Sequence, residues 1–496
     1  MKSTLQDTLV RYMDAGFPIL YVNTFEEDKA EAMIRSVVGG RHILSWSVLG
    51  FYAEKEHAAM DWNLAETLLR IVDGTVKADR SVLILRDVHT FLSDAVIVGY
   101  LKCLARRINN GEIDFTIILL SPVVVIPPEL EKQLTLLSMD YLTLPEIRKT
   151  IRDFCEEQDI PPLHQDFFNE LALALKGLSE FEIRNILALA ISDDGEITRA
   201  DLSLIFEQKK QIIQKSGILE MIPLKEGMDD IGGLERLKQW LRRKAKIFKN
   251  LEEAEKFGVD VPKGVLIAGM PGCGKSLNAK AAAKLFEVPL LRLDMGRIMG
   301  KYVGESEANM RRAIALAEAI SPCVLWIDEL EKAFAGTGGS GGGAEVTTRL
   351  FGTFLTWLQE KESLAFVVAT ANDITKLPPE LLRKGRFDEI FYVALPKKAE
   401  RKTIFTIHIR KRRPSDIETI DLDRLVTMTD GYSGADIEGV VKDSVEEAFT
   451  QGKQTITTDD VVRAIKDTHS LSEIMKDSID KMAKIYEERK FKNASE

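Results

Sequence analysis

Hydrophobic and polar residues alternate along the chain in a way that predicts mixed α/β structure. Short runs of consecutive apolar residues, typical of strands buried in parallel sheets, are separated by amphipathic stretches with helical spacing. In the second half these runs are GVLIAG, PLLRLD, CVLWIDE and LAFVVATAN, and in the first half FPILYVN, SVLILRD and DFTIILLS. Because strands and helices alternate in both halves, we expect two domains with parallel sheets.

The two halves also resemble each other, which indicates an internal duplication. Residues 114–145 align without a gap on residues 365–396, so that IPPELEKQ lies on LPPELLRK and MDYLTLP on the end of EIFYVALP. Further along, GLSEFEI matches GYSGADI and GEITRADL matches QTITTDDV. Ordered matches across a strand, a loop and a helical segment predict two modules, each an α/β domain followed by a helical lid.

These patterns also predict the domain boundaries. The tail alternates apolar and charged residues at helical spacing, and the glycine-rich Gly336–Ala344 is expected to be a flexible loop inside the second α/β domain. We predict an α/β domain over 1–145, its helical lid over 146–215, a linker over 216–228, a second α/β domain over 229–396, its lid over 397–470 and a C-terminal helix over 471–496.

Charge and composition narrow the class of protein. The formal net charge of −10 gives no global attraction to nucleic acid or to an anionic membrane. The four cysteines show no CxxC spacing, so we expect a reducing, cytosolic compartment and neither a zinc site nor a disulfide framework. The most apolar stretch, Phe115–Pro128, is too short and too rich in proline to span a bilayer, and no signal peptide is apparent.

The segment GMPGCGKS (Gly269–Ser276) carries the clearest chemistry. It fits the pattern G-x-x-x-x-G-K-[ST] and lies between the predicted strand GVLIAG and the helix-forming run LNAKAAAKLF, as this motif requires. Glycines let backbone N–H groups surround phosphates at the positive end of a helix. We expect Lys275 to reach the β- and γ-phosphates of ATP and the Ser276 hydroxyl to bind Mg²⁺.

The run CVLWIDE predicts a buried strand that ends in two acids, at the sheet edge where α/β proteins bind ligands. We expect Asp328 to hold Mg²⁺ through its water shell, and Glu329 to orient and deprotonate the attacking water. An ordinary strand with a polar end is the alternative, and the phosphate-binding loop upstream favours hydrolysis.

Seven motifs now stand in one order: DDIGGL, GMPGCGKS, KYVGESE, CVLWIDE, ATAN, LLRKGRFD and GYSGADI. Over residues 229–470 the chain therefore resembles the AAA ATPases, in the group of the proteasomal ATPases, the FtsH-type proteases and the p97-like unfoldases. The two-module layout also resembles an AAA family encoded in algal plastids and cyanobacteria, with relatives elsewhere in bacteria. The resemblance implies tandem AAA modules and the cofactors ATP and Mg²⁺. The chain has no HExxH, which excludes an attached FtsH-type protease.

The resemblance also implies roles for single residues. Asn372 resembles the sensor of the attacking water, and Arg383 and Arg386 resemble arginine fingers that reach the nucleotide of a neighbouring subunit, which implies a homohexamer. Solvated arginines, or arginines paired with acids such as Asp388, are the alternative. The implied nucleotide contacts are the loop residues Gly269, Met270, Pro271, Gly272, Cys273, Gly274, Lys275, Ser276 and Leu277, the adenine-side residues Ile231, Gly232 and His408, and Gly434 and Ala435 at the second-sensor position.

Two of these assignments have alternatives. A lone histidine on a helix, such as His408, is often structural. Tyr302, Val303 and Gly304 match the pore loop that grips an extended polypeptide in the family, whereas Tyr302 packed in a subunit interface is the other interpretation. At Gly434 and Ala435 this group has no arginine, so we expect the lid to sense nucleotide through backbone and packing contacts.

The first module lacks most of these residues. In the aligned loop NTFEEDKA (Asn23–Ala30), Lys29 stands at the position of Lys275, but the loop has no glycine and three acids lie where phosphate would bind. In the same alignment Asp87 matches Asp328, but the other catalytic positions are replaced by Val88, Ser121, Lys132 and Thr135. We predict a degenerate module that stabilises a ring or docks a partner.

Three functions follow from these patterns. The first is ATP hydrolysis in a ring that threads or remodels a protein substrate. The second is a regulatory or scaffold ATPase that switches the assembly of a partner complex without threading. The third, nucleic-acid remodelling, rests only on the basic runs His408–Pro414 and Arg242–Asn250, which are more simply solvated helix faces. We expect a cytoplasmic protein, or a stromal one if the gene is plastid-encoded.

Overall fold

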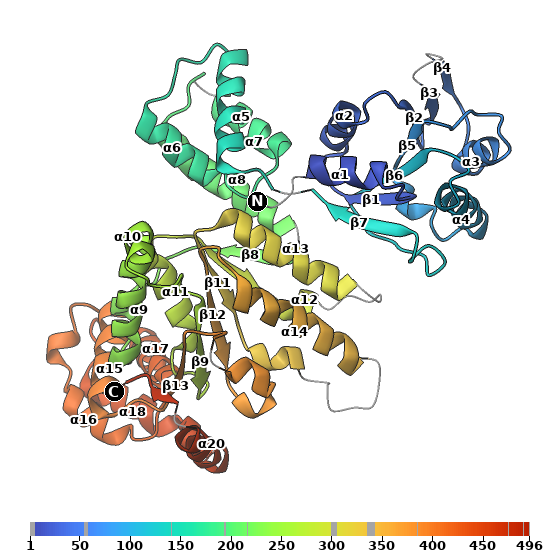
Figure 1. Ribbon diagram of the computed structural model, residues 1–496. Helices are drawn as coiled ribbons and strands as arrows, with labels where there is room; N and C mark the ends of the chain where they lie inside the picture. Colours follow the sequence, from blue (N-terminus) through green and yellow to red (C-terminus); the bar gives the residue numbers. More distant parts are fainter. Residues whose placement is uncertain are drawn as a thin grey trace. The chain divides into compact units, whose positions relative to one another are not determined.

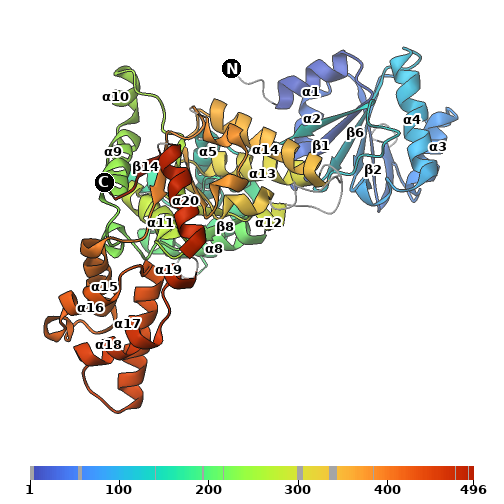
Figure 2. The same cartoon turned by 90° about the horizontal axis from the view of Figure 1, so that it is seen from below.

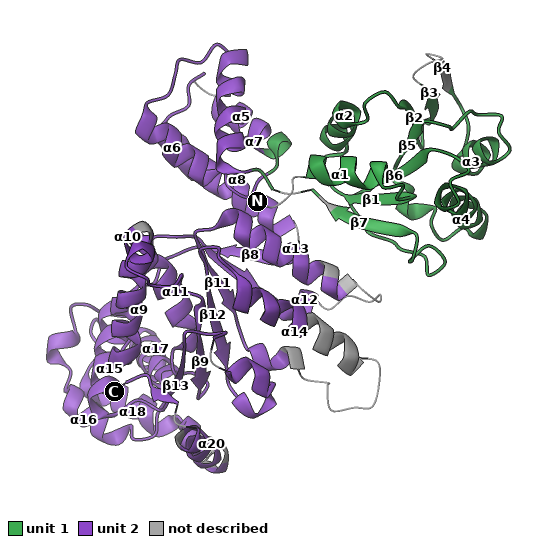
Figure 3. Cartoon of the chain, viewed as in Figure 1, with its two compact units in different colours: residues 1–142, 179–182 green, residues 143–178, 183–496 purple. Residues whose placement is uncertain are grey.

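The computed structural model of the chain, drawn in Figure 1, divides it into two compact units. Unit 1 holds residues 1–142 and 179–182, and unit 2 holds residues 143–178 and 183–496 (Figure 3). The structure describes residues 5–53, 58–139, 141–192, 195–215, 217–298, 305–334, 343–383, 385–474, 476–489 and 491–495.

Unit 1 is built on a sheet with the strand order β4-β3-β2-β5-β6-β1-β7, in which the pairs β4–β3 and β3–β2 are antiparallel and the other pairs are parallel. The strands are β1 (Ile19–Asn23), β2 (His42–Ser47), β3 (Gly50–Ala53), β4 (Ala58–Met60), β5 (Ser81–Arg86), β6 (Phe115–Ser121) and β7 (Leu134–Ser138). The helices are α1 (Leu5–Asp14), α2 (Glu27–Val37), α3 (Leu64–Val72) and α4 (Ala95–Asn109).

Helices cover both faces of this sheet, as Figure 2 shows for α1 and α2 on one side and α3 and α4 on the other. Successive strand residues point to opposite faces, so neighbours in one strand join different cores. Leu83 packs with α3 and α4, for example, while Val82 and Ile84 pack with α1 and α2. Burial on both faces explains why these strands read as continuous apolar runs.

Four helices follow the first sheet, and apart from the first turn of α7 they belong to unit 2. We call them the first lid: α5 (Leu144–Glu157), α6 (Gln165–Ala174), α7 (Glu180–Ala190) and α8 (Leu202–Lys215). Lys209 of α8 is buried and donates to the Ala174 carbonyl at 2.8 Å. A Cβ added to Gly177 would lie 2.4 Å from Ile320, and Lys176 donates to the Ser321 carbonyl. The first lid therefore packs on the second α/β domain.

The second sheet has the strand order β14-β13-β9-β12-β11-β10-β8. Its central strands β10-β11-β12-β9-β13 are parallel, and they repeat the order β2-β5-β6-β1-β7 of unit 1. This agreement confirms the predicted α/β class with parallel sheets and supports the internal duplication. The strands are β8 (Leu219–Ile222), β9 (Gly264–Gly269), β10 (Leu290–Leu293), β11 (Cys323–Ile327), β12 (Ala365–Ala371), β13 (Glu389–Val393) and β14 (Lys492–Asn493).

The strand equivalence corrects one part of the sequence alignment. Leu134 of β7 pairs with Ile19 in unit 1, as Glu389 of β13 pairs with Val265 in the second sheet. The counterpart of EIFYV is thus Leu134–Ser138, and the match of MDYLTLP with EIFYVALP was wrong by several residues. The loop before β7 is shorter than the loop before β13, and a gap-free alignment cannot register that difference.

The helices of the second α/β domain are α9 (Glu235–Lys249), α10 (Leu251–Lys256), α11 (Lys275–Phe286), α12 (Met295–Ile298), α13 (Glu305–Ile320) and α14 (Gly343–Glu360). Those of the second lid are α15 (Lys398–Arg412), α16 (Leu422–Met428), α17 (Gly434–Thr450) and α18 (Thr458–Asp467), which share one apolar core. None of the helices among the described residues has both the length and the apolar character that a membrane-spanning segment needs.

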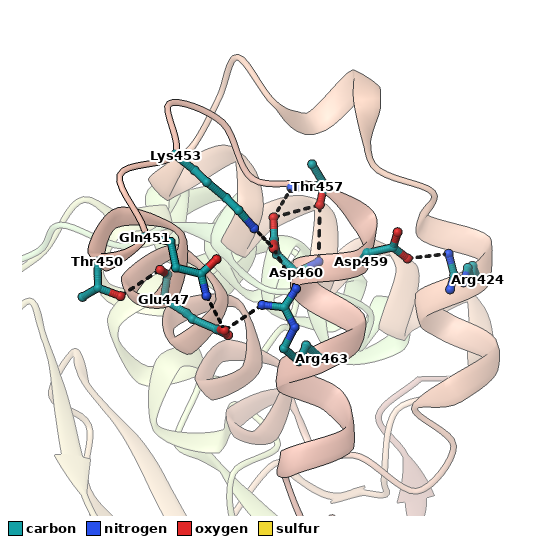
Figure 4. Close-up of polar contacts among 9 residues, drawn as sticks. All are labelled: Arg424, Glu447, Thr450, Gln451, Lys453, Thr457, Asp459, Asp460 and Arg463. Carbon is teal, nitrogen blue, oxygen red and sulfur yellow. Dashed lines mark hydrogen bonds and ion pairs between the residues drawn. The ribbon is translucent and has the colours of Figure 1, made fainter.

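Polar contacts fix the start of α18 in the second lid, as Figure 4 shows. The Asp460 carboxylate is buried, accepts from the backbone N–H and the hydroxyl of Thr457, and pairs with Lys453 and Arg463. Arg463 also donates to Glu447 of α17 at 2.7 Å. One buried carboxylate thus caps its own helix and joins it to the end of α17.

The tail ends differently from the single helix predicted over residues 471–496. It forms the helices α19 (Leu471–Ile474) and α20 (Lys476–Glu488), and then the short strand β14, which pairs with β13 in parallel. The buried Ala494 donates to Tyr392 of β13 at 2.8 Å and accepts from the N–H of Leu237 at 3.0 Å. The tail ends as a strand because its backbone groups find partners on the edge of the sheet at β13 and on α9.

Candidate functional site

A cavity of about 440 Å³ lies at the carboxyl ends of β9, β11 and β12 in the second α/β domain, where parallel sheets usually bind ligands. Its walls come from the loop before α9, the phosphate-binding loop, the ends of β11 and β12, and α15 and α17 of the second lid. The predicted residues that line it are Ile231, Gly232, Pro271, Gly272, Cys273, Gly274, Lys275, Ser276, Leu277, Asp328, Glu329, Asn372, His408, Gly434 and Ala435.

The phosphate-binding loop needs its glycines for steric and conformational reasons. Gly269 has a φ of 144°, and a Cβ there would lie 2.1 Å from the Val393 carbonyl oxygen. Gly274 has a φ of 82° and directly precedes Lys275, the first residue of α11. The backbone can adopt this path only without side chains, which leaves the first turn of α11 open toward the cavity.

Lys275 is the buried cation of the cavity. Its ammonium donates to the carbonyls of Gly269 at 2.9 Å and Met270 at 2.6 Å. These two loop residues were predicted to contact the nucleotide, but they do not line the cavity and instead hold Lys275. Burial lowers the pKa of Lys275 to about 8, although nearby acids, among them Glu331, oppose the shift. A bound anion would favour the charged form, so this lysine and its glycine loop fit a phosphate.

Ser276 and Asp328, two side chains that line the cavity, are joined by a hydrogen bond. The Ser276 hydroxyl donates to Oδ1 of Asp328 at 3.1 Å, and Thr370 donates to the same oxygen at 2.6 Å. Hydroxyl and carboxylate oxygens suit Mg²⁺, which keeps water and phosphate oxygens among its ligands. No group of three or more His, Cys, Asp or Glu side chains within the described residues could hold a metal ion by itself. Ser276 and Asp328 therefore fit a cation shared with phosphates.

Glu329 and Asn372 meet beside this pair. The Asn372 side-chain amide donates to Oε1 of Glu329 at 3.1 Å, and the other carboxylate oxygen pairs with Lys332. Glu329 has a φ of 49°, a left-handed conformation that is unusual for a glutamate, and its N–H donates to the Thr370 hydroxyl at 3.0 Å. A strained backbone held by its neighbours is typical of functional sites. Thr370 was not predicted, because its only signal is its place at the end of an apolar strand.

The opposite end of the cavity is formed by the loop before α9 and by the second lid. A Cβ on Gly232 would lie 2.4 Å from Ile404, and Glu400 accepts from the N–H of Leu234 at 3.1 Å. His408 lies 3.7 Å from Glu438, and burial lowers the pKa of His408, so a neutral ring faces the cavity. Glu400, Ile404 and Glu438 also line this end and were missed, because no local pattern marks their contacts.

The second lid touches the phosphate-binding loop directly. The N–H of Ala435, in the first turn of α17, donates to the Gly272 carbonyl at 2.9 Å. A Cβ on Gly272 would lie 2.9 Å from the Ala435 Cβ, and one on Gly434 would lie 3.1 Å from the Gly272 oxygen. Small residues at the second-sensor position therefore permit a backbone hydrogen bond between the lid and the loop.

Several predicted residues lie elsewhere. Neither Arg383, which is exposed, nor Arg386 lines the cavity, and Nη1 of Arg386 is buried without a hydrogen-bond partner among the described residues. The segment Tyr302, Val303 and Gly304 lies outside the described residues, as does most of the glycine-rich stretch from Gly336.

The corresponding place in unit 1 is filled by ion pairs. Arg86, at the end of β5, donates to Asp28 at 2.9 Å and to Glu31 at 2.7 Å, both on α2. Lys29 pairs with Glu180 at 2.9 Å. Burial, together with the neighbouring Asp87, raises the pKa of Glu27 to about 7. The environment at the start of α2 is thus acidic and disfavours a phosphate.

Comparison with protein-family models gives four matches along the chain. Residues 265–395 match the ATPase family associated with various cellular activities (AAA), and residues 419–462 match the AAA+ lid domain. Residues 5–139 match the N-terminal domain of the SpoVK-like AAA ATPases, and residues 145–216 match their second domain.

Similar proteins extend over most of the chain. The uncharacterized AAA domain-containing protein ycf46 of Guillardia theta is 39% identical over 459 residues, which cover 92% of this chain and 89% of that protein. The ycf46 protein of Pyropia yezoensis is 36% identical over 490 residues, 97% of this chain and 98% of its own. The proteasome-activating nucleotidase of Aeropyrum pernix is 34% identical over 246 residues, 48% of this chain and 58% of its own.

Proposed function

This chain belongs to the AAA ATPases of the ycf46 type, which bind and hydrolyse ATP, and from that premise we propose that it works as a homohexameric ring that remodels or threads a protein substrate. The observation that carries the proposal is the meeting of Lys275, Asp328, Glu329 and Asn372 around one cavity. Hydrolysis in a ring needs this set together with a cation from a neighbouring subunit.

We assign the phosphates of ATP to the glycine loop and the start of α11, where Lys275 balances their charge. Ser276 and Asp328 would hold Mg²⁺, which supplies charge neutralisation on the phosphate oxygens when bound. Asn372 donates to Glu329 at 3.1 Å, and in our proposal this pair orients the attacking water while the Glu329 carboxylate accepts its proton. The adenine would lie beside Ile231, Gly232 and His408.

The arginines support assembly into a ring. Arg383 and Arg386 do not line the cavity of their own chain, and the exposed position of Arg383 leaves it able to reach another subunit. A guanidinium supplied by a neighbour would stabilise charge on the transferred phosphoryl group, so each site would be complete only between two chains. The homohexamer is the ring that the family resemblance implies.

The nature of the substrate rests on sequence likeness. The proteasome-activating nucleotidase of Aeropyrum pernix carries in its name an action on a protein-degrading complex. Its likeness to this chain, together with the sequence KYVGESE, favours a polypeptide held by Tyr302 and Val303 over a nucleic acid. The basic run Arg242–Asn250 lies on the last turns and the C-cap of α9, where Ala245 and Phe248 are buried, so its charged residues form the solvent face of a core helix. We place the protein in the cytoplasm, or in the plastid stroma where the gene is plastid-encoded.

A substrate trap tests the proposal. In the full-length protein, Glu329→Gln should keep the binding of ATP and Mg²⁺ while it lowers turnover by roughly a hundredfold or more, as loss of a general base does. Polypeptides captured with this variant in ATP should be absent with Lys275→Ala, the matched variant that cannot hold the phosphates. Turnover at the wild-type rate in Glu329→Gln, or equal capture by both variants, would refute the proposal.

The second candidate, an ATPase that switches a partner assembly, predicts a different result for the pore segment. Tyr302→Ala should abolish action on a captured substrate if threading occurs, and should leave it unchanged if the ring only switches. The degenerate first module is tested in the same protein. After Lys275→Ala, ATP-dependent stabilisation should vanish, whereas residual tight ATP binding would mean that unit 1 binds nucleotide.

A further inference from the structure

Among the buried polar atoms of unit 2 that have no hydrogen-bond partner within the described residues, two concern the catalytic edge of the second sheet. They are Oε2 of Glu331, on the turn that follows β11, and the hydroxyl of Tyr486, on α20 of the tail. Buried polar atoms in native proteins are nearly always paired, with ordered water where no protein group is available. Both atoms therefore call for a partner.

Glu331 is already part of the catalytic region. It is 6% exposed, and its other oxygen, Oε1, accepts from the backbone N–H of Asn372 at 2.9 Å. The side chain of Asn372 in turn donates to Glu329 at 3.1 Å. Any shift of the Glu331 carboxylate would move the backbone of Asn372 and then the amide that holds Glu329.

Tyr486, on α20 of the tail, lies beside β13, the strand next to the edge strand β14 of the second sheet. Its ring stacks on Tyr392 of β13, with ring centroids 3.9 Å apart, and Tyr392 pairs with Ala268, the residue before Gly269. The strand β14 fixes the end of the tail, because Ala494 donates to Tyr392 and is itself buried. Figure 1 shows α20 and β13 in the same part of unit 2.

The strand register brings the two unpartnered atoms toward one place, because Ala268 pairs with Tyr392 of β13 on one side and with Ala371, the residue before Asn372, on the other. Burial raises the pKa of Tyr486, and the nearby groups Tyr392, Asp373 and Glu331 raise it further. The hydroxyl is therefore protonated at neutral pH and can donate, whereas a carboxylate oxygen can only accept. A donor and an acceptor of complementary chemistry thus stand without partners in one electrostatic neighbourhood.

We propose that the tail positions the sensor Asn372: the Tyr486 hydroxyl donates through a bridging water to Oε2 of Glu331, and Glu331 holds Asn372 against Glu329. Tyr486 and Glu331 are positioning residues that act through Asn372. The inference rests on the proposed roles of Glu329 and Asn372 in hydrolysis. The tail elements α20 and β14, which carry no nucleotide-binding motif, thus take part in ATP hydrolysis.

The test is a double-mutant cycle on full-length protein with steady-state ATP hydrolysis as the readout. Tyr486→Phe removes only the hydroxyl, and Glu331→Gln removes the charge while it keeps the shape. Each variant should lower kcat roughly tenfold, the usual effect of losing one hydrogen bond to a charged group, with KM for ATP within about twofold. The double variant should be no slower than the slower single variant, because both changes break one chain.

Tyr432→Phe is the matched control. Tyr432 is a second buried tyrosine, whose hydroxyl donates to the carbonyls of Ile465 at 3.0 Å and Thr468 at 2.7 Å in the lid. This variant should lower the melting temperature, and its effect on kcat should multiply with that of Glu331→Gln. A wild-type kcat for Tyr486→Phe, or multiplying effects of Tyr486→Phe and Glu331→Gln, would overturn the inference.

Glu329→Gln separates this inference from the proposed function. If Glu329→Gln hydrolyses ATP at the wild-type rate, the assignment of the general base is wrong and the inference loses its premise. If Glu329→Gln is inactive while the cycle is multiplicative, only the link between the tail and Asn372 is refuted.

Discussion

The buried Lys209 should make the stability of unit 2 depend on pH in a way that one substitution removes. This residue lies on α8 of the first lid, is 1% exposed, and donates only to the Ala174 carbonyl among its described partners. Burial, opposed by the thiol of Cys323 and aided by the charge of Lys176, lowers its pKa from 10.5 to about 7. The cationic form is thus disfavoured in the folded protein.

The sign and size of the effect follow from proton binding. Between pH 7 and pH 9 the unfolded chain keeps the Lys209 proton, because its pKa there is near 10.5, while the folded protein has largely released it. The unfolded state binds more protons in this range, so stability rises with pH. At 1.36 kcal/mol per unit, less the fraction still protonated near pH 7, the gain is about 2 kcal/mol.

Lys209→Met should abolish this gain. Methionine keeps the apolar stem and leaves one carbonyl unpaired, at a cost of about 1 kcal/mol. Because the desolvation of a charge is removed at the same time, we expect the variant to be more stable than wild type at pH 7 by about 2 kcal/mol and nearly equal at pH 9.

Denaturant unfolding at pH 7, 8 and 9 measures the difference between the two proteins, so titration of other groups cancels. Tryptophan fluorescence reports on unit 2 through Trp240, Trp326 and Trp357. The reasoning is refuted if wild type and Lys209→Met respond equally to pH, or if the variant is less stable at pH 7.

Three further outcomes follow from the second module. Ala435→Pro removes the N–H that Gly272 accepts, at a first-turn position that tolerates proline, so KM for ATP should rise about fivefold while Ala435→Ser stays near wild type. Gly269→Ala should abolish the rise in melting temperature that ATP gives, because its Cβ would lie 2.1 Å from the Val393 carbonyl; unchanged stabilisation by ATP would contradict this. Asp460→Asn should destabilise the second lid by about 2 kcal/mol in hydrogen exchange, and in wild type the hydrogen bonds and ion pairs that lower the pKa of Asp460 should make that stability fall as the pH drops below about 4.

Local sequence patterns predicted the parts of the fold that depend on burial. The strand Ala365–Ala371 is buried on both faces, so nearly all of its residues are apolar and the strand is recognisable in the sequence. The start of the lid helix α17 also carries a local signal, because Ser433 and Asp436 form a capping box. The phosphate-binding loop is equally local, since its glycines, Lys275 and Ser276 act within one turn of chain.

What the sequence did not predict depends on contacts between distant segments. Glu400 accepts from the N–H of Lys397 at the start of α15, as its position suggests, but its contact with Leu234 across the cavity has no local signal. The strand β14 is only two residues long and forms because β13 offers a free edge. The position of β7 was predicted wrongly because it depends on the length of the loop between β6 and β7, and a loop length leaves no hydrophobic pattern in the sequence.

The comparison of the two modules explains why we assign hydrolysis to the second alone. In both sheets, the end of one central strand faces the helix that follows the first parallel strand. In the second module this contact is Asp328 with Ser276, a carboxylate and a hydroxyl that leave room for a cation and phosphates. In unit 1 it is Arg86 with Asp28 and Glu31, a closed set of charges that satisfy one another. Phosphate could enter there only by breaking the pair of Arg86 with the largely buried Glu31, which would leave that carboxylate unpaired beside a second anion. The first module therefore keeps the strand order of the fold, and we expect its own ion pairs to disfavour nucleotide binding.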